Sequence, residues 1–273
     1  MSQVLLAAII VGAAGIGLGF FLSIMSKRLE VPVDEKEEKI REMLPGNNCG
    51  ACGYPGCDGA AAAVARGEAP PTLCPVGGPK IADMLAELTG GDAAEVENKV
   101  AFVKCAGDCE HAKENFEYTG VNTCAGTVVT PNGGAKGCEH GCRGFGDCVD
   151  ACEFDAIHII NGIAVVDKEK CVACEKCVAA CPKDLIEMIP YKNKYAVQCN
   201  SPDRAKDVMM VCSAGCIGCK KCERACPLPE IAIHVNDNLA KIDYSRCINC
   251  GKCAEACPTK VIEFMPLKSK AKK

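Results

Sequence analysis

The sequence predicts an α+β fold in which an amino-terminal transmembrane helix leads into a series of small cysteine-rich units. Three observations carry this expectation: a long apolar run at the start, 25 cysteines in 273 residues, and a cysteine pattern that occurs twice in the second half. With 7 Phe, 5 Tyr and no Trp, these units lack the large side chains that fill an ordinary core. The cysteine content indicates a disulfide or metal scaffold, and the net charge of −4 gives no support for nucleic-acid binding.

The first 26 residues are expected to form a single-pass membrane anchor. Residues 4–25 carry no charge, and a helix of this length spans about 33 Å, which is enough to cross a bilayer. No basic residue precedes the run, whereas a cleaved signal peptide would begin with one. Basic residues begin at Lys27 and Arg28, in a juxtamembrane linker over 27–45. The positive-inside rule therefore places the remaining chain on the cytoplasmic side of the cell (inner) membrane.

A first cysteine group lies in a small domain expected over residues 46–90. An Ala-rich segment at 58–67 is helical by propensity and separates three closely spaced thiols from a fourth. Four thiols in this arrangement can hold a [4Fe–4S] cluster. Zinc and two disulfides are the alternatives, although a reducing cytoplasm argues against disulfides. The group consists of Cys49, Cys52, Cys57 and Cys74.

Residues 91–136 are expected to be a linker region without a cluster of their own. Their cysteines, Cys105, Cys109 and Cys124, show no spacing that is typical of a cluster. We interpret them as ordinary buried or free thiols, and a sixth cluster that uses them is the alternative.

The second half is an internal duplication, with one module at 137–192, a second at 193–266 and a basic tail at 267–273. The run C-x2-C-x2-C-x3-C-P begins at Cys171 and again at Cys247. In two-cluster ferredoxins such a run supplies three thiols to one cluster and its fourth thiol to the other cluster. Each copy is therefore expected to be a 2[4Fe–4S] ferredoxin-like module. Short apolar segments predict strands at 157–160, 163–166, 185–189, 231–235, 239–242 and 261–265.

If each run gives its fourth thiol to the other cluster of its module, three complete ligand sets follow. They are Cys216, Cys219, Cys222 and Cys257; Cys226, Cys247, Cys250 and Cys253; and Cys152, Cys171, Cys174 and Cys177.

The fourth set is irregular, because Phe145 stands where the second copy has Cys219. Cys138 is the nearest thiol that could take this role, and its counterpart in the second copy, Cys212, would then be surplus. Cys199 has no expected role. The resulting set is Cys138, Cys142, Cys148 and Cys181.

The sequence contains no glycine-rich phosphate loop and no nucleophile elbow, so it indicates neither a nucleotide site nor a catalytic residue. The four histidines show no ligand spacing among themselves. The cysteines are therefore the candidate functional residues, and one-electron transfer is the chemistry that they indicate.

The order of these parts resembles the B subunit of the Rnf complex: an anchor, then LPGNNCGACGYPGC and CPVGG, then ferredoxin modules. The resemblance implies an electron-transfer component of a membrane complex that couples ferredoxin oxidation to NAD reduction and to sodium or proton translocation. It implies soluble ferredoxin, the other membrane subunits and a flavin- and NAD-binding subunit as partners. Together with the ligand sets it implies five [4Fe–4S] clusters. A membrane-anchored polyferredoxin that serves a hydrogenase or another dehydrogenase, and a structural zinc protein, are the alternatives.

Overall fold

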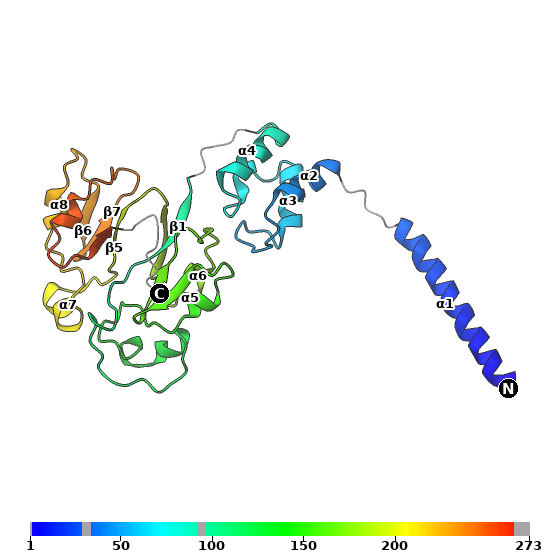
Figure 1. Ribbon diagram of the computed structural model, residues 1–273, viewed down its shortest axis with the longest axis horizontal. Coiled ribbons are helices and arrows are strands. Elements are labelled where there is room, and N and C mark those ends of the chain that lie inside the picture. Colours follow the sequence, from blue (N-terminus) through cyan, green and yellow to red (C-terminus); the bar gives the residue numbers. More distant parts are fainter. Residues whose placement is uncertain (1, 29–33, 92–96, 265–273) are drawn as a thin grey trace.

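The computed structural model describes residues 2–28, 34–91 and 97–264 (Figure 1). The chain begins with helix α1, Ser2–Arg28. In the described part of the chain, no helix combines the length and the hydropathy that a membrane crossing requires. The expected anchor falls partly outside this description, because the side chains of residues 1–8, 10, 11, 14 and 26–28 are not described. Residues 29–33 of the expected linker and the basic tail at 267–273 also lie outside the described residues.

Three short helices and a 3-10 turn form the small domain that follows. Helix α2 begins after Asp34, whose carboxylate accepts a hydrogen bond of 3.0 Å from the amide of Lys36 and so satisfies a free donor of the first turn. The domain closes over a core that contains Ile40 and Leu85, both fully buried. Its elements are α2 (Glu35–Met43), α3 (Cys57–Ala65), η1 (Pro71–Leu73) and α4 (Gly78–Thr89).

The first module contains two antiparallel strand pairs and two one-turn helices. Strand β1 pairs with β4 so that Val103 lies opposite Ile186. Strands β2 and β3 form a hairpin whose turn residues, Asn161 and Gly162, both have positive φ, as a tight hairpin requires. The elements are β1 (Lys99–Val103), η2 (Ala125–Val129), η3 (Pro131–Gly133), α5 (Asp147–Asp150), β2 (Ile157–Ile160), β3 (Ile163–Val166), α6 (Lys176–Ala180) and β4 (Ile186–Pro190).

The second module repeats this plan beside the first (Figure 1). Strand β5 pairs with β8 so that Val197 lies opposite Ile262, and β6 pairs with β7 in a hairpin. The amide of Ala106 donates a hydrogen bond of 3.0 Å to the carbonyl of Gln198, which joins the two modules. The elements are β5 (Tyr195–Val197), α7 (Ala205–Val211), α8 (Lys221–Ala225), β6 (Ile233–Asn236), β7 (Leu239–Ile242), α9 (Lys252–Glu255) and β8 (Ile262–Phe264).

The duplication extends further toward the amino terminus than the cysteine spacing indicates. Strands β1 and β5 each pair with the last strand of their own module, so they are equivalent elements. Strand β1 lies in the region 91–136, which the sequence analysis interpreted as a linker, and its Ala101 and Val103 belong to the core of the first module. Two residues after each of these strands comes a cysteine, Cys105 in the first module and Cys199 in the second.

Candidate metal centres

Three of the expected ligand sets line three separate cavities, each with all four of its cysteines. In the first module, the set that we call site 3 lines a cavity of about 320 Å³. In the second module, sites 4 and 5 line cavities of about 300 and 370 Å³. These volumes include the space open to solvent at each mouth. Site 3 consists of Cys152, Cys171, Cys174 and Cys177; site 4 of Cys216, Cys219, Cys222 and Cys257; and site 5 of Cys226, Cys247, Cys250 and Cys253.

Left-handed turns followed by one-turn helices bring these thiols around each cavity. Positive φ angles occur inside the cysteine runs, at Glu175, Lys220 and Gly251, where they reverse the chain between neighbouring cysteines. Each turn is followed by a helix that carries the third thiol, as α6 carries Cys177. In site 3 the amide of Ala101 on β1 also donates a hydrogen bond of 3.5 Å to the sulfur of Cys171.

The thiols of these sites are buried and act on one another electrostatically. Burial, and after it the charges of its site partners, raise the pKa of Cys177 to about 12. The same two causes raise the pKa of Cys222 and of Cys253 to about 11. Four thiolates held together in this way need a cation between them, and iron or zinc supplies it.

The small domain gathers a fourth group, site 1, around its helical core. Cys52, Cys57 and Cys74 pack against the core. Burial raises the pKa of Cys74, and the charges of Cys52 and Cys49 add to the shift. The amide of Cys57 donates a hydrogen bond of 2.8 Å to the side chain of Asn48, which fixes the turn on which Cys49 and Cys52 lie. Site 1 is our name for the set that the sequence predicts, Cys49, Cys52, Cys57 and Cys74.

In the irregular group of the first module, a cysteine other than the expected one lies near Cys142, Cys148 and Cys181. Burial, and after it the charges of Cys142, Cys124 and Cys181, raise the pKa of Cys148 to about 12. Asp147, at the start of α5, accepts hydrogen bonds of 2.7 Å from the amide of Cys124 and 2.9 Å from that of the next residue. This contact holds Cys124 beside the helix that carries Cys148. We call the group Cys124, Cys142, Cys148 and Cys181 site 2.

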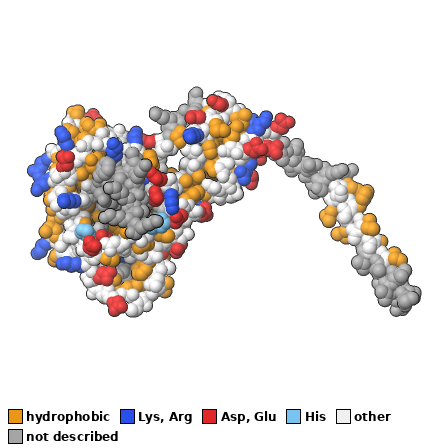
Figure 2. Space-filling model, viewed as in Figure 1, with side chains coloured by type: hydrophobic (Ala, Val, Ile, Leu, Met, Phe, Trp, Pro, Cys, Tyr) orange, Lys and Arg blue, Asp and Glu red, His pale blue; other side chains and the backbone are white. Residues whose placement is uncertain are grey.

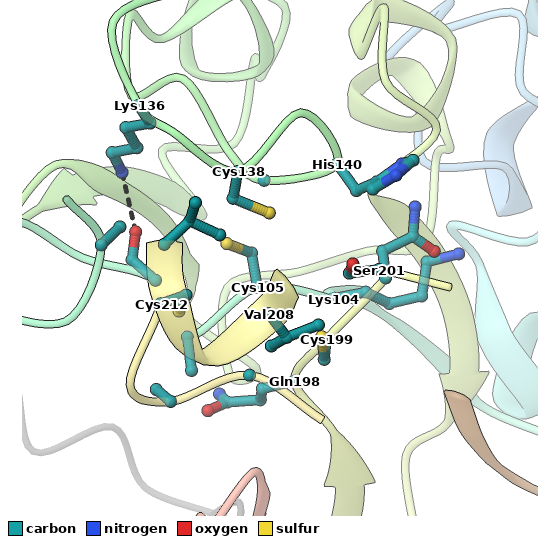
Figure 3. Close-up of a pocket in the computed structure, with 18 residues that line it drawn as sticks. Lys104, Cys105, Lys136, Cys138, His140, Gln198, Cys199, Ser201, Val208 and Cys212 are labelled. Atoms are coloured by element: carbon teal, nitrogen blue, oxygen red, sulfur yellow. Dashed lines mark hydrogen bonds between the residues drawn. The ribbon is translucent and has the colours of Figure 1, made fainter. Parts of the chain in front are cut away.

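Cys138, which the sequence analysis placed in this set, lies elsewhere. It lines a cavity of about 450 Å³ together with Cys105, Cys199 and Cys212 (Figure 3). We call these four cysteines the bridging site, because two come from each module. The remaining cysteine of the chain, Cys109, is exposed.

Sequence reasoning missed Cys105, Cys124 and Cys199 as members of four-thiol groups. A signal for Cys105 and Cys199 was present, since each follows a short apolar segment and a polar residue, in VAFVKC and YAVQC. Cys124 offered no such signal, because it lies in an insertion without a counterpart in the second module.

A mononuclear metal centre is not what these groups resemble. Within residues 2–28, 34–91 and 97–264, no three His, Cys, Asp or Glu side chains are arranged to hold a single metal ion. A [4Fe–4S] cluster instead binds one thiolate at each of four irons, so its thiolates surround a cavity as they do here.

Comparisons with known proteins agree with this geometry. The family model for an Fe-S cluster matches residues 44–76. One model of a 4Fe-4S binding domain matches residues 164–187 and 240–263. A second such model matches residues 213–232.

Curated relatives match most of the chain. The B subunit of the Na(+)-translocating ferredoxin:NAD(+) oxidoreductase complex of Acetobacterium woodii is 43% identical over 247 residues, which cover 90% of this chain and 73% of the relative. The B subunit of the proton-translocating counterpart from Clostridium ljungdahlii is 38% identical over 90% of this chain and 86% of its own length. The B subunit of an ion-translocating oxidoreductase complex from Methanosarcina acetivorans is 40% identical over 90% of this chain and 93% of its own length.

Proposed function

Since this chain belongs to the family of B subunits of ion-translocating oxidoreductase complexes, we propose that it is the electron-transfer component of a membrane complex that couples ferredoxin oxidation to NAD reduction. The observation that carries the proposal is the set of three cavities, each lined by all four cysteines of one ferredoxin-type ligand set. Reduced ferredoxin is the proposed electron donor, and sodium or proton translocation is the proposed coupled process.

Sites 1 to 5 are the proposed ligand sets of five [4Fe–4S] clusters. Bound clusters would supply one-electron transfer at low potential. The chain's own residues supply the thiolates, exclude water and direct backbone amides toward sulfur, as Ala101 does toward Cys171 and Ala156 does toward Cys152. Such hydrogen bonds and the local burial tune the reduction potential of a cluster.

Helix α1 is the proposed membrane anchor, with the cysteine-rich part of the chain on the cytoplasmic side. Its described side chains are largely apolar and lie open to the surroundings (Figure 2); Ile16 is 77% exposed and Phe20 is 70% exposed. A Cβ atom added at Gly15 or Gly19 would meet nothing within 4 Å, which leaves room for the close approach of a helix from another membrane protein of the complex.

The sites follow one another in an order that suits a relay toward the membrane. The charge of Cys177 in site 3 raises the pKa of Cys148 in site 2, although burial is the main cause of that shift. The charge of Cys49 in site 1 contributes likewise to the raised pKa of Cys174 in site 3, again after burial. Cys52 of site 1 and Cys171 of site 3 also line one open cavity, and sites 2, 3 and 1 are therefore the proposed order of the relay. Site 1 belongs to the domain nearest to α1 in the chain.

Ferredoxin is proposed to dock at the second module, the end of this order that is far from α1 in the chain. Lys220, Lys221 and Arg224 are exposed next to Cys219 and Cys222 of site 4. Figure 2 shows basic side chains at the edge of the molecule where Figure 1 places α8. An acidic ferredoxin would be steered to such a surface by charge complementarity.

Rapid mixing of the anaerobically purified chain with reduced ferredoxin tests this function. The expected result is that the iron–sulfur absorbance of the chain bleaches after mixing. The chain should accept one electron for each ferredoxin cluster that is oxidised. A chain that contains zinc in place of iron would refute the proposal. A chain that holds iron but purifies with a hydrogenase rather than with an NAD-reducing flavoprotein would show that it serves a different oxidoreductase.

A further inference from the structure

We propose that Cys105, Cys138, Cys199 and Cys212 bind a sixth [4Fe–4S] cluster, which connects the two ferredoxin modules electrically. The inference rests on the proposed function for its role in electron transfer, but the binding site itself rests on the geometry of the bridging site.

The four cysteines form two equivalent pairs, one from each module. Cys105 and Cys199 follow the equivalent strands β1 and β5. The residues before them, Lys104 and Gln198, donate amide hydrogen bonds of 2.8 Å to Leu185 and Val261, which precede the partner strands β4 and β8. Cys138 and Cys212 likewise precede equivalent cysteine runs. The duplication thus supplies two thiols from each copy, and the cavity lies where the copies meet.

The space between these thiols suits the same group as sites 3, 4 and 5. Its volume of about 450 Å³, which likewise includes space open to solvent, is not smaller than the 300 to 370 Å³ of those cavities. Glycines line it beside the sulfurs: a Cβ at Gly107 would lie 3.4 Å from the sulfur of Cys212 and 3.6 Å from that of Cys105. A Cβ at Gly141 would lie 3.6 Å from the sulfur of Cys138. Figure 3 shows the sulfurs of Cys105 and Cys138 turned toward each other across this space.

Two buried cationic side chains lie beside the bridging site and its neighbouring sites. Lys136 is 5% exposed and donates hydrogen bonds of 2.8 Å to the carbonyls of Gly107 and Gly162. Arg143 is 8% exposed and donates to four carbonyl groups, including that of Cys138 at 3.1 Å.

Among the ion pairs of the residues that the structure describes, none includes Lys136 or Arg143. Burial lowers the pKa of Arg143, and the charges that oppose this shift most strongly are those of Cys138, Cys105 and Cys142. A buried charge is costly unless a counter-charge accompanies it. A cluster with four thiolates carries net negative charge and would provide that counter-charge for both Lys136 and Arg143.

Backbone amides surround the sulfurs, as they do in the other sites. The amide of Cys142 donates a hydrogen bond of 3.3 Å to the sulfur of Cys105. Burial raises the pKa of Cys138 and of Cys212, while the amides of His140 and Ala214 oppose the shift by favouring the thiolate. Thiolates with amide donors are the form that binds iron.

The bridging site is also the neighbour of both modules' clusters. The hydrogen bond between Cys142 of site 2 and Cys105 joins it to the first module. On the other side, Cys199 and Cys212 of the second module line the same cavity; burial, with a smaller contribution from the charge of Cys216 in site 4, raises the pKa of Cys199 to about 11. An electron that leaves site 4 would reduce this position and be passed on to site 2, so each transfer oxidises one cluster and reduces the next by a single electron.

Zinc is the competing occupant, because four cysteines also form structural zinc sites. Zinc would require the four sulfurs to converge to about 2.3 Å from one point. In the described part of the chain no such convergence occurs, and the cavity separates the sulfurs instead.

Iron counting on the anaerobically reconstituted full chain tests the proposal. Native mass spectrometry and iron and zinc analysis of the unmodified chain should give about 24 iron atoms, as six [4Fe–4S] clusters require. About 20 iron atoms would overturn the sixth site and leave the proposed function standing. One zinc with about 20 iron atoms would also overturn it, whereas zinc throughout would refute the proposed function itself.

Variants locate the extra cluster. Cys138→Ala and Cys212→Ala should each lose about 4 iron atoms, and the double variant should also lose about 4, because both thiols belong to one cluster. Cys109→Ala, which removes the exposed cysteine outside all six groups, is the matched control and should lose none. A loss of about 8 iron atoms from the double variant would assign the two cysteines to different clusters and contradict the proposal. If an alanine variant does not fold, Cys138→Ser provides a second test, because the serine oxygen can still reach iron. It should keep the iron but shift the electron paramagnetic resonance signal of one cluster, and an unchanged spectrum would count against the site.

Discussion

Replacement of Cys124 by alanine should remove one cluster from the first module, and a second substitution should restore it. In the second module Cys219 is the proposed middle thiol of the corresponding site, and Phe145 stands at that place in the first module. The structure brings Cys124 to the site from an insertion instead, held by Asp147 at 2.7 Å. Cys124→Ala should therefore lose about 4 iron atoms, and Cys124→Ala with Phe145→Cys should regain them.

The module should survive the loss. Burial and the neighbouring thiols raise the pKa of Cys148 to about 12, so this thiol stays neutral near pH 7 once iron is absent, and no unpaired charge is left in the core. Phe145 packs against Tyr118 with ring centroids 5.3 Å apart, so its replacement costs a ring contact of about 0.5–1.5 kcal/mol.

Iron analysis and circular dichroism of the two variants provide the assay. Full iron content in Cys124→Ala would refute this assignment. Full loss that Phe145→Cys does not restore would show that the two modules do not place the middle thiol equivalently.

Three further predictions concern docking, the anchor and the small domain. Lys220→Glu with Lys221→Glu should slow reduction by ferredoxin about tenfold at low salt, with the difference vanishing near 1 M salt; stopped-flow rates that do not depend on these charges would place docking elsewhere. Deletion of residues 1–26 should yield a soluble chain with unchanged iron content that no longer supports ferredoxin-driven NAD reduction with the membrane subunits, and a truncated chain that still sediments with membranes would contradict the role of α1. Leu85→Ala removes a fully buried side chain and should destabilise the small domain by about 2–5 kcal/mol, measured as a lower thermal midpoint; no change in that midpoint would show that α4 contributes little to holding site 1.

Much of this architecture could be predicted from the sequence, because its cysteine spacing and its short apolar segments are local signals. The expected strand at 157–160 coincides with β2, and those at 163–166 and 239–242 coincide with β3 and β7. The expected strand at 185–189 is shifted by one residue, as β4 covers Ile186–Pro190. Membership of the family of B subunits, which the order of motifs indicated, is confirmed by relatives that match 90% of the chain.

The remainder depended on contacts that are distant in the sequence. Strand β5 has only three residues, Tyr195–Val197, so hydrophobic alternation cannot identify it, and it becomes a strand by pairing with β8. Cys138 lies four residues before Cys142, and that proximity favoured one shared cluster. The chain instead turns Cys138 toward Cys199 and Cys212 of the other module. Spacing along a sequence predicts which thiols share a turn, but it does not predict which thiols meet where two modules pack.

Mössbauer spectroscopy of the chain reconstituted with ⁵⁷Fe tests the central claim most directly, since it reports the chemical form of every iron atom. If the cysteine groups are relay sites, all of the iron should occur as oxidised [4Fe–4S] clusters in the isolated protein, and a strong reductant should add one electron to each. Iron in separate tetrathiolate centres, or zinc in place of iron, would contradict the account.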